Sequence, residues 1–158
     1  MAMKDSENKA RISEIKIEID KLESQLLPFT TIDPVDACGK TISRIIHGFY
    51  NSLHREGDCC LILFTDNTAL YQEGTEFIVD PDIWWSSAYR DSQSNKYVTN
   101  SYLTDFGYWM RDEHLLNEEV ADKILELAIE MENLRCQERV KEEIQQKLDE
   151  ISKLKDQL

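Results

Sequence analysis

The last third of the sequence contains no Gly or Pro after Gly107, so nothing there interrupts a helix. Asn117 is a suitable N-cap residue, and the two glutamates that follow it favour the positive end of a helix dipole. A helix from Asn117 to Leu158 would be roughly 60 Å long. A chain of 158 residues cannot cover such a rod with a small globule, so the rod is predicted to pack on other helices.

Apolar residues recur at helical spacing at both ends of the chain. An N-terminal helix is predicted from about Asp5 to Leu27, ended by Pro28, with a stripe of coiled-coil type. Beyond Val140 the C-terminal spacing changes to the eleven-residue period that straightens a supercoil. Both stripes predict a homo-oligomer joined by helices. The predicted oligomerisation residues are Ile12, Ile15, Ile19, Leu22, Leu26, Ile124, Leu127, Met131, Leu134, Ile144, Leu148 and Ile151.

The middle of the chain has the pattern of a β-rich domain. Residues 59–73 predict a hairpin, because an apolar run, a turn pair at Asp66 and Asn67 and a second apolar run follow one another. Residues 39–50 favour a strand because of Gly39, Gly48 and many β-branched residues, although their isoleucines also fit a helix. Residues 75–79 predict a fourth strand, and 97–109 either one more strand or turn-rich packing.

Together these patterns predict an α+β fold with a small antiparallel β-meander. The expected divisions are an N-terminal helix over residues 1–28, a compact β-rich domain over 29–111 and a coiled-coil helix over 112–158. The middle segment is near the lower size limit for a comfortable hydrophobic core, and assembly with other copies would relieve that shortage.

Charge and cysteine spacing restrict the partners. The chain has a net charge of -13 and no basic segment, so DNA, RNA and membrane surfaces are not expected partners. The four cysteines match no zinc-binding spacing and are expected to be structural thiols. With no signal peptide and no apolar run of membrane-spanning length, we expect a cytoplasmic location, in the host cytoplasm if the protein is viral.

The sequence contains no recognisable catalytic motif, and we expect neither an enzyme nor a cofactor. Asp33 with Asp36, and Asp80 with Asp82, flank prolines and are expected to fix turns; the functional alternative is Mg²⁺ binding or acid-base chemistry in a hydrolase. The three histidines form no metal-binding pattern and are expected to be exposed or hydrogen-bonded: His47, His54 and His114.

Aromatic and arginine side chains gather between residues 83 and 111. Aromatic faces stack on nucleobases and Arg binds phosphate, so the stretch suits a compact nucleotide. The alternative is a core or intersubunit contact, because the same residue types dominate interfaces. Adjacent tryptophans on a strand face opposite ways, so only one would line a given pocket. The predicted ligand-binding residues are Trp85, Tyr89, Arg90, Trp84, Asn100 and Arg111, the first three being the leading candidates.

The order of elements resembles a group of small phage proteins. A strand opened by Gly39-Lys40-Thr41-Ile42 and a hairpin over Leu61–Leu70, with flanking helices, is similar to the phage Thoeris anti-defence sponge proteins. The resemblance is architectural and transfers no individual residue. It implies a non-enzymatic oligomer that sequesters a small cyclic nucleotide or ADP-ribose-type signal, in pockets at subunit interfaces. The alternative hypothesis is a coiled-coil structural or adaptor protein whose middle domain docks a protein partner.

Overall fold

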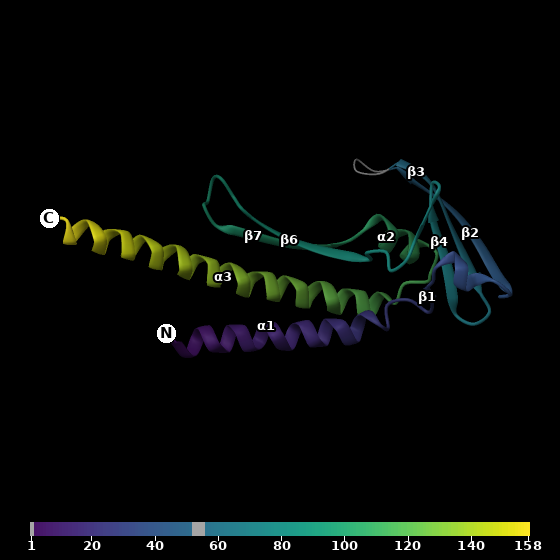
Figure 1. Ribbon diagram of the computed structural model, residues 1–158, viewed down its shortest axis with the longest axis horizontal. Coiled ribbons are helices and arrows are strands. Elements are labelled where there is room, and N and C mark those ends of the chain that lie inside the picture. The colour runs from purple at the N-terminus through teal and green to yellow at the C-terminus, as the bar shows by residue number, and fades with distance from the viewer. Residues whose placement is uncertain (1, 52–55) are drawn as a thin grey trace. The chain divides into compact units, whose positions relative to one another are not determined.

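The computed structural model describes residues 2–51 and 56–158, with side chains from Glu7 onward, so His54 lies outside the described residues. The fold is α+β, with an N-terminal helix, antiparallel strands and a long C-terminal helix, as the sequence predicts (Figure 1). The elements in chain order are α1 (Ala2–Glu23), β1 (Thr30–Thr31), the 3-10 helix η1 (Pro34–Ala37), β2 (Ile42–Asn51), β3 (Glu56–Phe64), β4 (Thr68–Glu73), β5 (Glu76–Ile78), β6 (Trp84–Arg90), β7 (Tyr97–Leu103), α2 (Asp105–Asp112) and α3 (Glu118–Asp156).

The larger sheet contains the predicted meander. Strands β2, β3, β4 and β5 pair antiparallel in sequence order, and β1 adds to β4 in parallel. Ile46 lies opposite Leu61, which lies opposite Tyr71, and all three side chains are buried on one face. The predicted strand over 39–50 and the predicted hairpin are therefore confirmed, and β6 and β7 form a separate two-stranded sheet.

Helix α2 packs on the buried face of the larger sheet. The Phe106 ring lies 4.5 Å from the Tyr71 ring, and the Trp109 ring meets the Tyr50 ring edge-on at 6.1 Å. Gly48 makes this approach possible, because a Cβ there would lie 2.7 Å from the Trp109 indole. Aromatic packing between α2 and the sheet thus makes up much of this core.

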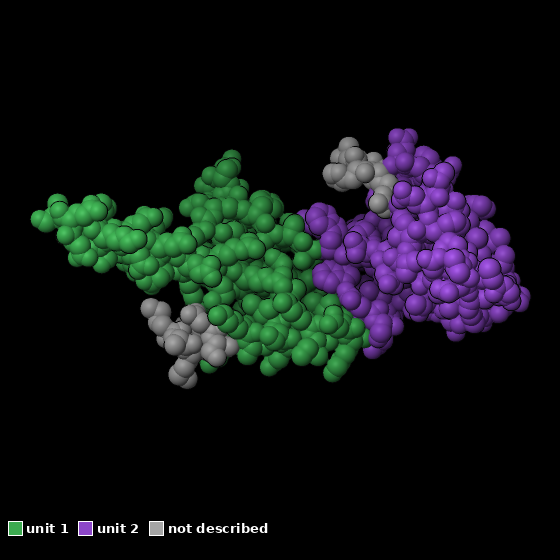
Figure 2. Space-filling model, in the orientation of Figure 1, with its two compact units in different colours: residues 1–21, 86–101, 123–158 green, residues 22–85, 102–122 purple. Residues whose placement is uncertain are grey.

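The chain forms two compact units (Figure 2). Unit 1 combines the N-terminal segment up to Lys21 with residues 86–101 and 123–158, and unit 2 combines residues 22–85 with 102–122. These units do not follow the three consecutive segments that the sequence suggests, because residues far apart in the sequence meet within each unit.

In unit 1, α1 runs antiparallel to α3. The Arg11 guanidinium donates to Glu130 at 2.7 Å, and the Asn8 amide donates to Glu138 at 3.0 Å. Ile15 and Ile19, on the stripe of α1, are buried. Ser101 of β7 donates to the main-chain oxygen of Leu125 at 2.8 Å, so β7 also contacts α3.

The structure differs from the expected elements, or adds to them, at three places. Helix α1 ends at Glu23 rather than Leu27, because the chain turns there through hydrogen bonds from Gln25 and Leu26 back to the preceding residues. Residues 83–96 contain strand β6, for which the sequence made no assignment. Residues 97–109 contain the further strand that the sequence allows, β7 over Tyr97–Leu103, but they continue into a helix that was not expected, α2, which Thr104 caps.

The described residues contain no helix that is both long and apolar enough to cross a membrane.

Candidate functional site

A short linker between β5 and β6, Asp80-Pro81-Asp82, lies at the centre of the site. Asp80 adopts a left-handed backbone conformation with φ of 53°, and its N–H donates to the hydroxyl of Thr31 at 2.7 Å. The hydroxyl of Thr104 donates to the main-chain oxygen of Asp82 at 2.5 Å. The linker is therefore held from both sides within unit 2.

Thr104 fixes α2 against the same linker. Its side chain accepts from the N–H of Gly107 at 3.1 Å, which makes it the N-cap of α2. Its own N–H donates to the Ile83 carbonyl at 3.0 Å. Gly107 is needed here, since a Cβ would lie 2.3 Å from the Ile83 oxygen. The absence of a side chain lets the first turn of α2 approach the linker closely.

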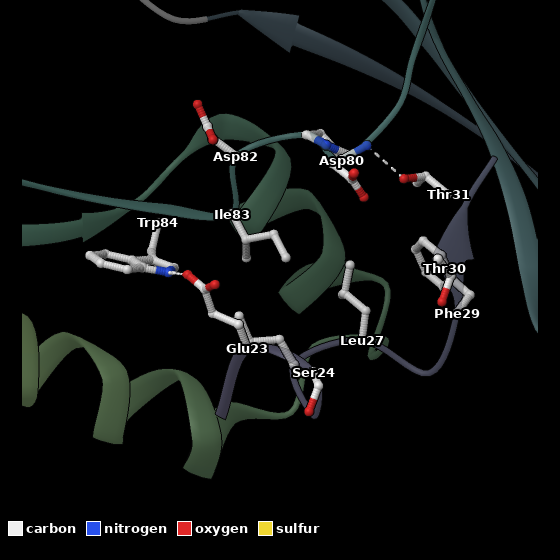
Figure 3. A pocket seen from close by; sticks show the side chains of 12 residues that line it. Glu23, Ser24, Leu27, Phe29, Thr30, Thr31, Asp80, Asp82, Ile83 and Trp84 are labelled. Atoms are coloured by element: carbon white, nitrogen blue, oxygen red, sulfur yellow. Dashed lines mark hydrogen bonds between the residues drawn. The ribbon is translucent and has the colours of Figure 1, made fainter. Parts of the chain in front are cut away.

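One cavity lies between the linker and the segment after α1. It has a volume of about 580 Å³, and its lining includes Glu23, Asp80, Asp82 and Trp84 (Figure 3). The indole N–H of Trp84 donates to the Glu23 carboxylate at 2.8 Å, and Figure 3 draws this bond at the edge of the cavity. Trp84 is thus already bound to an acidic side chain of its own chain.

The larger cavity, which we call the aromatic pocket, has a volume of about 880 Å³. Four aromatic rings and four carboxylates contribute to its wall. The Trp85 ring packs against the Tyr102 ring with centroids 5.0 Å apart. Its lining residues are Glu73, Ile78, Asp80, Pro81, Asp82, Trp85, Tyr102, Leu103, Thr104, Asp105, Phe106 and Tyr108. As alternation along a strand predicts, the adjacent tryptophans line different cavities.

The charged side chains that line the aromatic pocket are all acidic. Its lining contains four Asp or Glu residues and, among the described residues, no Lys, Arg or His. The described part of the chain contains no group of three or more His, Cys, Asp or Glu side chains arranged to hold a metal ion. The arrangement therefore suits an organic cation: carboxylates attract the charge and aromatic faces contact it.

Glu73 connects the pocket to a buried polar chain. The hydroxyl of Tyr71 donates to the Glu73 carboxylate, and the Tyr71 and Tyr50 hydroxyls lie 2.7 Å apart. Burial, reinforced by the bond to Glu73, strongly raises the pKa of Tyr71. Tyr71 therefore stays a neutral donor that orients Glu73.

The other predicted ligand residues are not all brought to this pocket. Tyr89, Arg90 and Asn100 belong to unit 1, whereas Trp84, Trp85 and Arg111 belong to unit 2. Arg90 donates to Glu143 at 2.6 Å and lies over the Tyr97 ring, so its guanidinium already has an anionic partner. Arg111, at the end of α2, lies over the Tyr108 ring, whose residue lines the pocket.

Several pocket residues were not singled out as ligand candidates from the sequence. Tyr102, Phe106 and Tyr108 come from the segment around α2, and Asp105 lies in the first turn of that helix. Thr104 followed by Asp105, an N-cap residue with an acidic residue in the first turn, is the sequence signal that locates this helix. Asp80 and Asp82, which the sequence predicts to fix a turn, occupy the linker and also line both cavities.

The predicted oligomerisation residues fall into two groups. Most lie in the segments that pack within the chain: Ile15, Ile19, Leu26, Ile124, Leu127 and Met131 are buried, and Ile12, Leu22 and Leu134 are half-buried. The remaining three lie near the end of α3 with exposed fractions of 54, 54 and 51 per cent: Ile144, Leu148 and Ile151. Contacts between copies are therefore not needed to bury the α1 stripe.

No protein-family model matches this chain, and comparison with curated proteins and with solved structures found no match.

Proposed function

We propose that this chain is a non-enzymatic binding protein that holds a positively charged organic ligand in the aromatic pocket of unit 2. The observation that carries this proposal is the composition of the pocket wall. Four carboxylates and the rings of Trp85, Tyr102, Phe106 and Tyr108 surround one cavity of about 880 Å³. That volume lies within the usual range for small-ligand pockets.

Charge decides which ligand class the pocket favours. A guanidinium or ammonium group over an aromatic face gains about 0.5–2 kcal/mol, with the larger values where water is excluded. Nearby carboxylates add Coulomb attraction, which would become repulsion for a phosphate. A nucleotide-like ligand of the ADP-ribose type, and with it the resemblance to the Thoeris sponge proteins, stays a prediction. Its phosphates would find none of the usual cationic partners in this pocket.

A melting-temperature screen tests the proposal. Spermidine, arginine amide and short Lys/Arg peptides are compared with cyclic ADP-ribose and linear nucleotides, and the ligand is recovered after denaturation. We expect the cations to raise the melting temperature by mass action and to return unaltered. A rise with nucleotides alone would reject the cationic ligand, and recovery of an altered ligand would reject the non-enzymatic assignment.

Matched aromatic variants locate the binding site. Trp85 and Tyr89 both lie on β6 with exposed fractions of 51 and 54 per cent, but only Trp85 lines the pocket. Trp85→Ala should abolish the shift produced by cations, whereas Tyr89→Ala should leave it unchanged. Equal loss in both variants would place binding elsewhere.

We also propose that copies associate through the end of α3. The stripe continues beyond Glu138, which the Asn8 amide contacts, and its last members, the α3 stripe, are exposed: Val140, Ile144, Leu148, Ile151 and Leu154. A helix of this pattern buries such a face by packing on an equivalent helix. This face also supports the adaptor alternative, in which a helix of another protein occupies it.

Sedimentation velocity separates these outcomes. The variant Ile144→Glu/Leu148→Glu, which we call the stripe variant, should lower the mass of the assembly, whereas Gln146→Glu, between the two positions, should not. A wild-type chain that sediments as a monomer at micromolar concentration would reject self-association and favour the adaptor alternative.

A further inference from the structure

Strand β2 lies at the edge of the larger sheet. In the part of the chain that the structure describes, β3 is the only strand paired with it, over a register from Ile42 to Asn51. Every second residue of such a strand directs its N–H and C=O groups away from the sheet. A ten-residue edge of this kind is longer than most strands in globular proteins.

Strand β2 also exposes large apolar side chains at this edge. Ile46 and Tyr50 face α2 and are buried, while Ile45 and Phe49 point to the opposite face with exposed fractions of 50 and 57 per cent. Edge strands of monomeric proteins are commonly protected by charges, prolines or short length. In β2 the one charged residue is Arg44, and no proline is present.

The scarcity of acidic residues around β2 indicates which partner could pair with this edge. The chain carries a net charge of -13, yet the sequence has no Asp or Glu between Asp36 and Glu56. Two copies can therefore approach along β2 without bringing carboxylates together, which they cannot do over most of the acidic surface. Of the described cations near the strand, Lys40 is paired with Asp66 and Arg44 with Glu113. The described part of the edge is thus nearly neutral, which favours a second copy over an acidic peptide.

From these observations we infer that β2 pairs antiparallel with β2 of a second copy, extending the sheet across a two-fold axis. A strand that pairs with itself gives a closed, isologous interface. Pairing centred on His47 places Ile45 opposite the partner subunit's Phe49, a cross-strand pair of β-branched and aromatic residues. This interface uses other residues than the aromatic pocket and the α3 stripe, so each can be tested with its own variants.

Sedimentation velocity of the stripe variant tests the inference without the contribution of α3. We expect this variant to be a dimer at micromolar concentration and to become a monomer of half that mass when Ile45→Glu and Phe49→Glu are added. Phe77→Glu, on strand β5 of the same sheet, is the matched control, and it should leave the dimer intact. A stripe variant that is already monomeric, or a dimer that survives the added glutamates, would overturn the inference, and the proposed role of α3 would still stand.

Amide hydrogen exchange provides a measurement that does not depend on the folding of the β2 variants. In the stripe variant, amides within residues 42–51 should exchange more slowly at high concentration and speed up on dilution, because dissociation exposes the outward N–H groups. Exchange in this segment that is independent of concentration would overturn the pairing of β2 with a second copy.

Discussion

The Trp85 indole packs against the Tyr102 ring in the wall of the aromatic pocket, with centroids 5.0 Å apart and planes inclined by 40°. One ring comes from β6 and the other from β7, so the pairing of these strands sets the shape of the wall. Trp85 keeps an exposed fraction of 51 per cent, which leaves a large part of the indole accessible to a ligand. Tyr102 therefore supports the ring of Trp85, the residue that we propose contacts the ligand.

Substitutions of Tyr102 and of Trp85 should have different effects, the first on stability and the second on ligand binding. Tyr102→Ala should lower the free energy of unfolding by more than about 1 kcal/mol, because the usual contribution of an aromatic pair is lost together with the buried area of the ring. Trp85→Phe keeps a ring at the pocket and should retain binding better than Trp85→Ala. Urea unfolding measures the stability, and ligand titration measures the affinity. Full cation binding by Trp85→Ala would show that the indole does not contact the ligand.

Gly107→Ala tests the close approach of α2 to the linker. Alanine is normally better than glycine inside a helix by about 1 kcal/mol. Here the added methyl would lie 2.3 Å from the Ile83 oxygen, so we expect a net loss of more than about 2 kcal/mol in the free energy of unfolding. Asp112→Ala, an exposed change in the same helix, should alter stability by less than about 0.5 kcal/mol. A stabilised Gly107→Ala variant would mean that the linker does not constrain α2.

The sequence predicts the helical and hairpin parts of this fold well because their signals are local. Long apolar periodicity locates α3, and the turn at Asp66 and Asn67 locates the hairpin. The aromatic pocket is harder to predict. Its wall joins Glu73 of β4 to Tyr108 of α2, and only the tertiary fold brings them together. Likewise, only the tertiary fold shows that Trp85 and Arg90, which lie on the same strand, belong to different compact units.

Thiol labelling tests the burial of Cys59. Burial raises the pKa of this thiol to about 11, so about one thousandth of it is ionised near pH 8. We expect Cys38, which is exposed, to react with iodoacetamide readily in the folded chain, and Cys59 to react only after unfolding. Mass spectrometry of labelled peptides measures both rates, and comparable rates in the folded chain would contradict the buried position of Cys59.

The Arg90–Glu143 pair predicts a pH dependence. The hydrogen bond from Arg90 lowers the pKa of Glu143, so the folded state favours the carboxylate more than the unfolded state does. The stabilisation is therefore complete above the ordinary glutamate pKa and is lost as the pH falls through the lowered value. Glu143→Gln should destabilise the chain at neutral pH and match the wild type in acid.

Thermal unfolding across acidic and neutral pH measures this difference. Glu142→Gln, an exposed neighbouring change, serves as the control and should remain close to the wild type throughout. High salt should also reduce the effect of Glu143→Gln, because both partners are accessible to solvent. A Glu143→Gln deficit that persists unchanged in acid would show that the effect does not come from ionisation.

The most direct test of the account is an equilibrium titration with two ligands that differ only in charge. Both are used with an acetylated α-amino group, so that arginine amide carries one positive charge, on its guanidinium, and citrulline amide, whose neutral urea group has nearly the same shape, carries none. Tryptophan fluorescence reports binding, since Trp85 lines the pocket. We predict saturable binding of arginine amide that weakens with salt and is lost in Trp85→Ala, with little binding of citrulline amide. Equal binding of both, or of neither while cyclic ADP-ribose binds, would contradict the proposed cationic ligand.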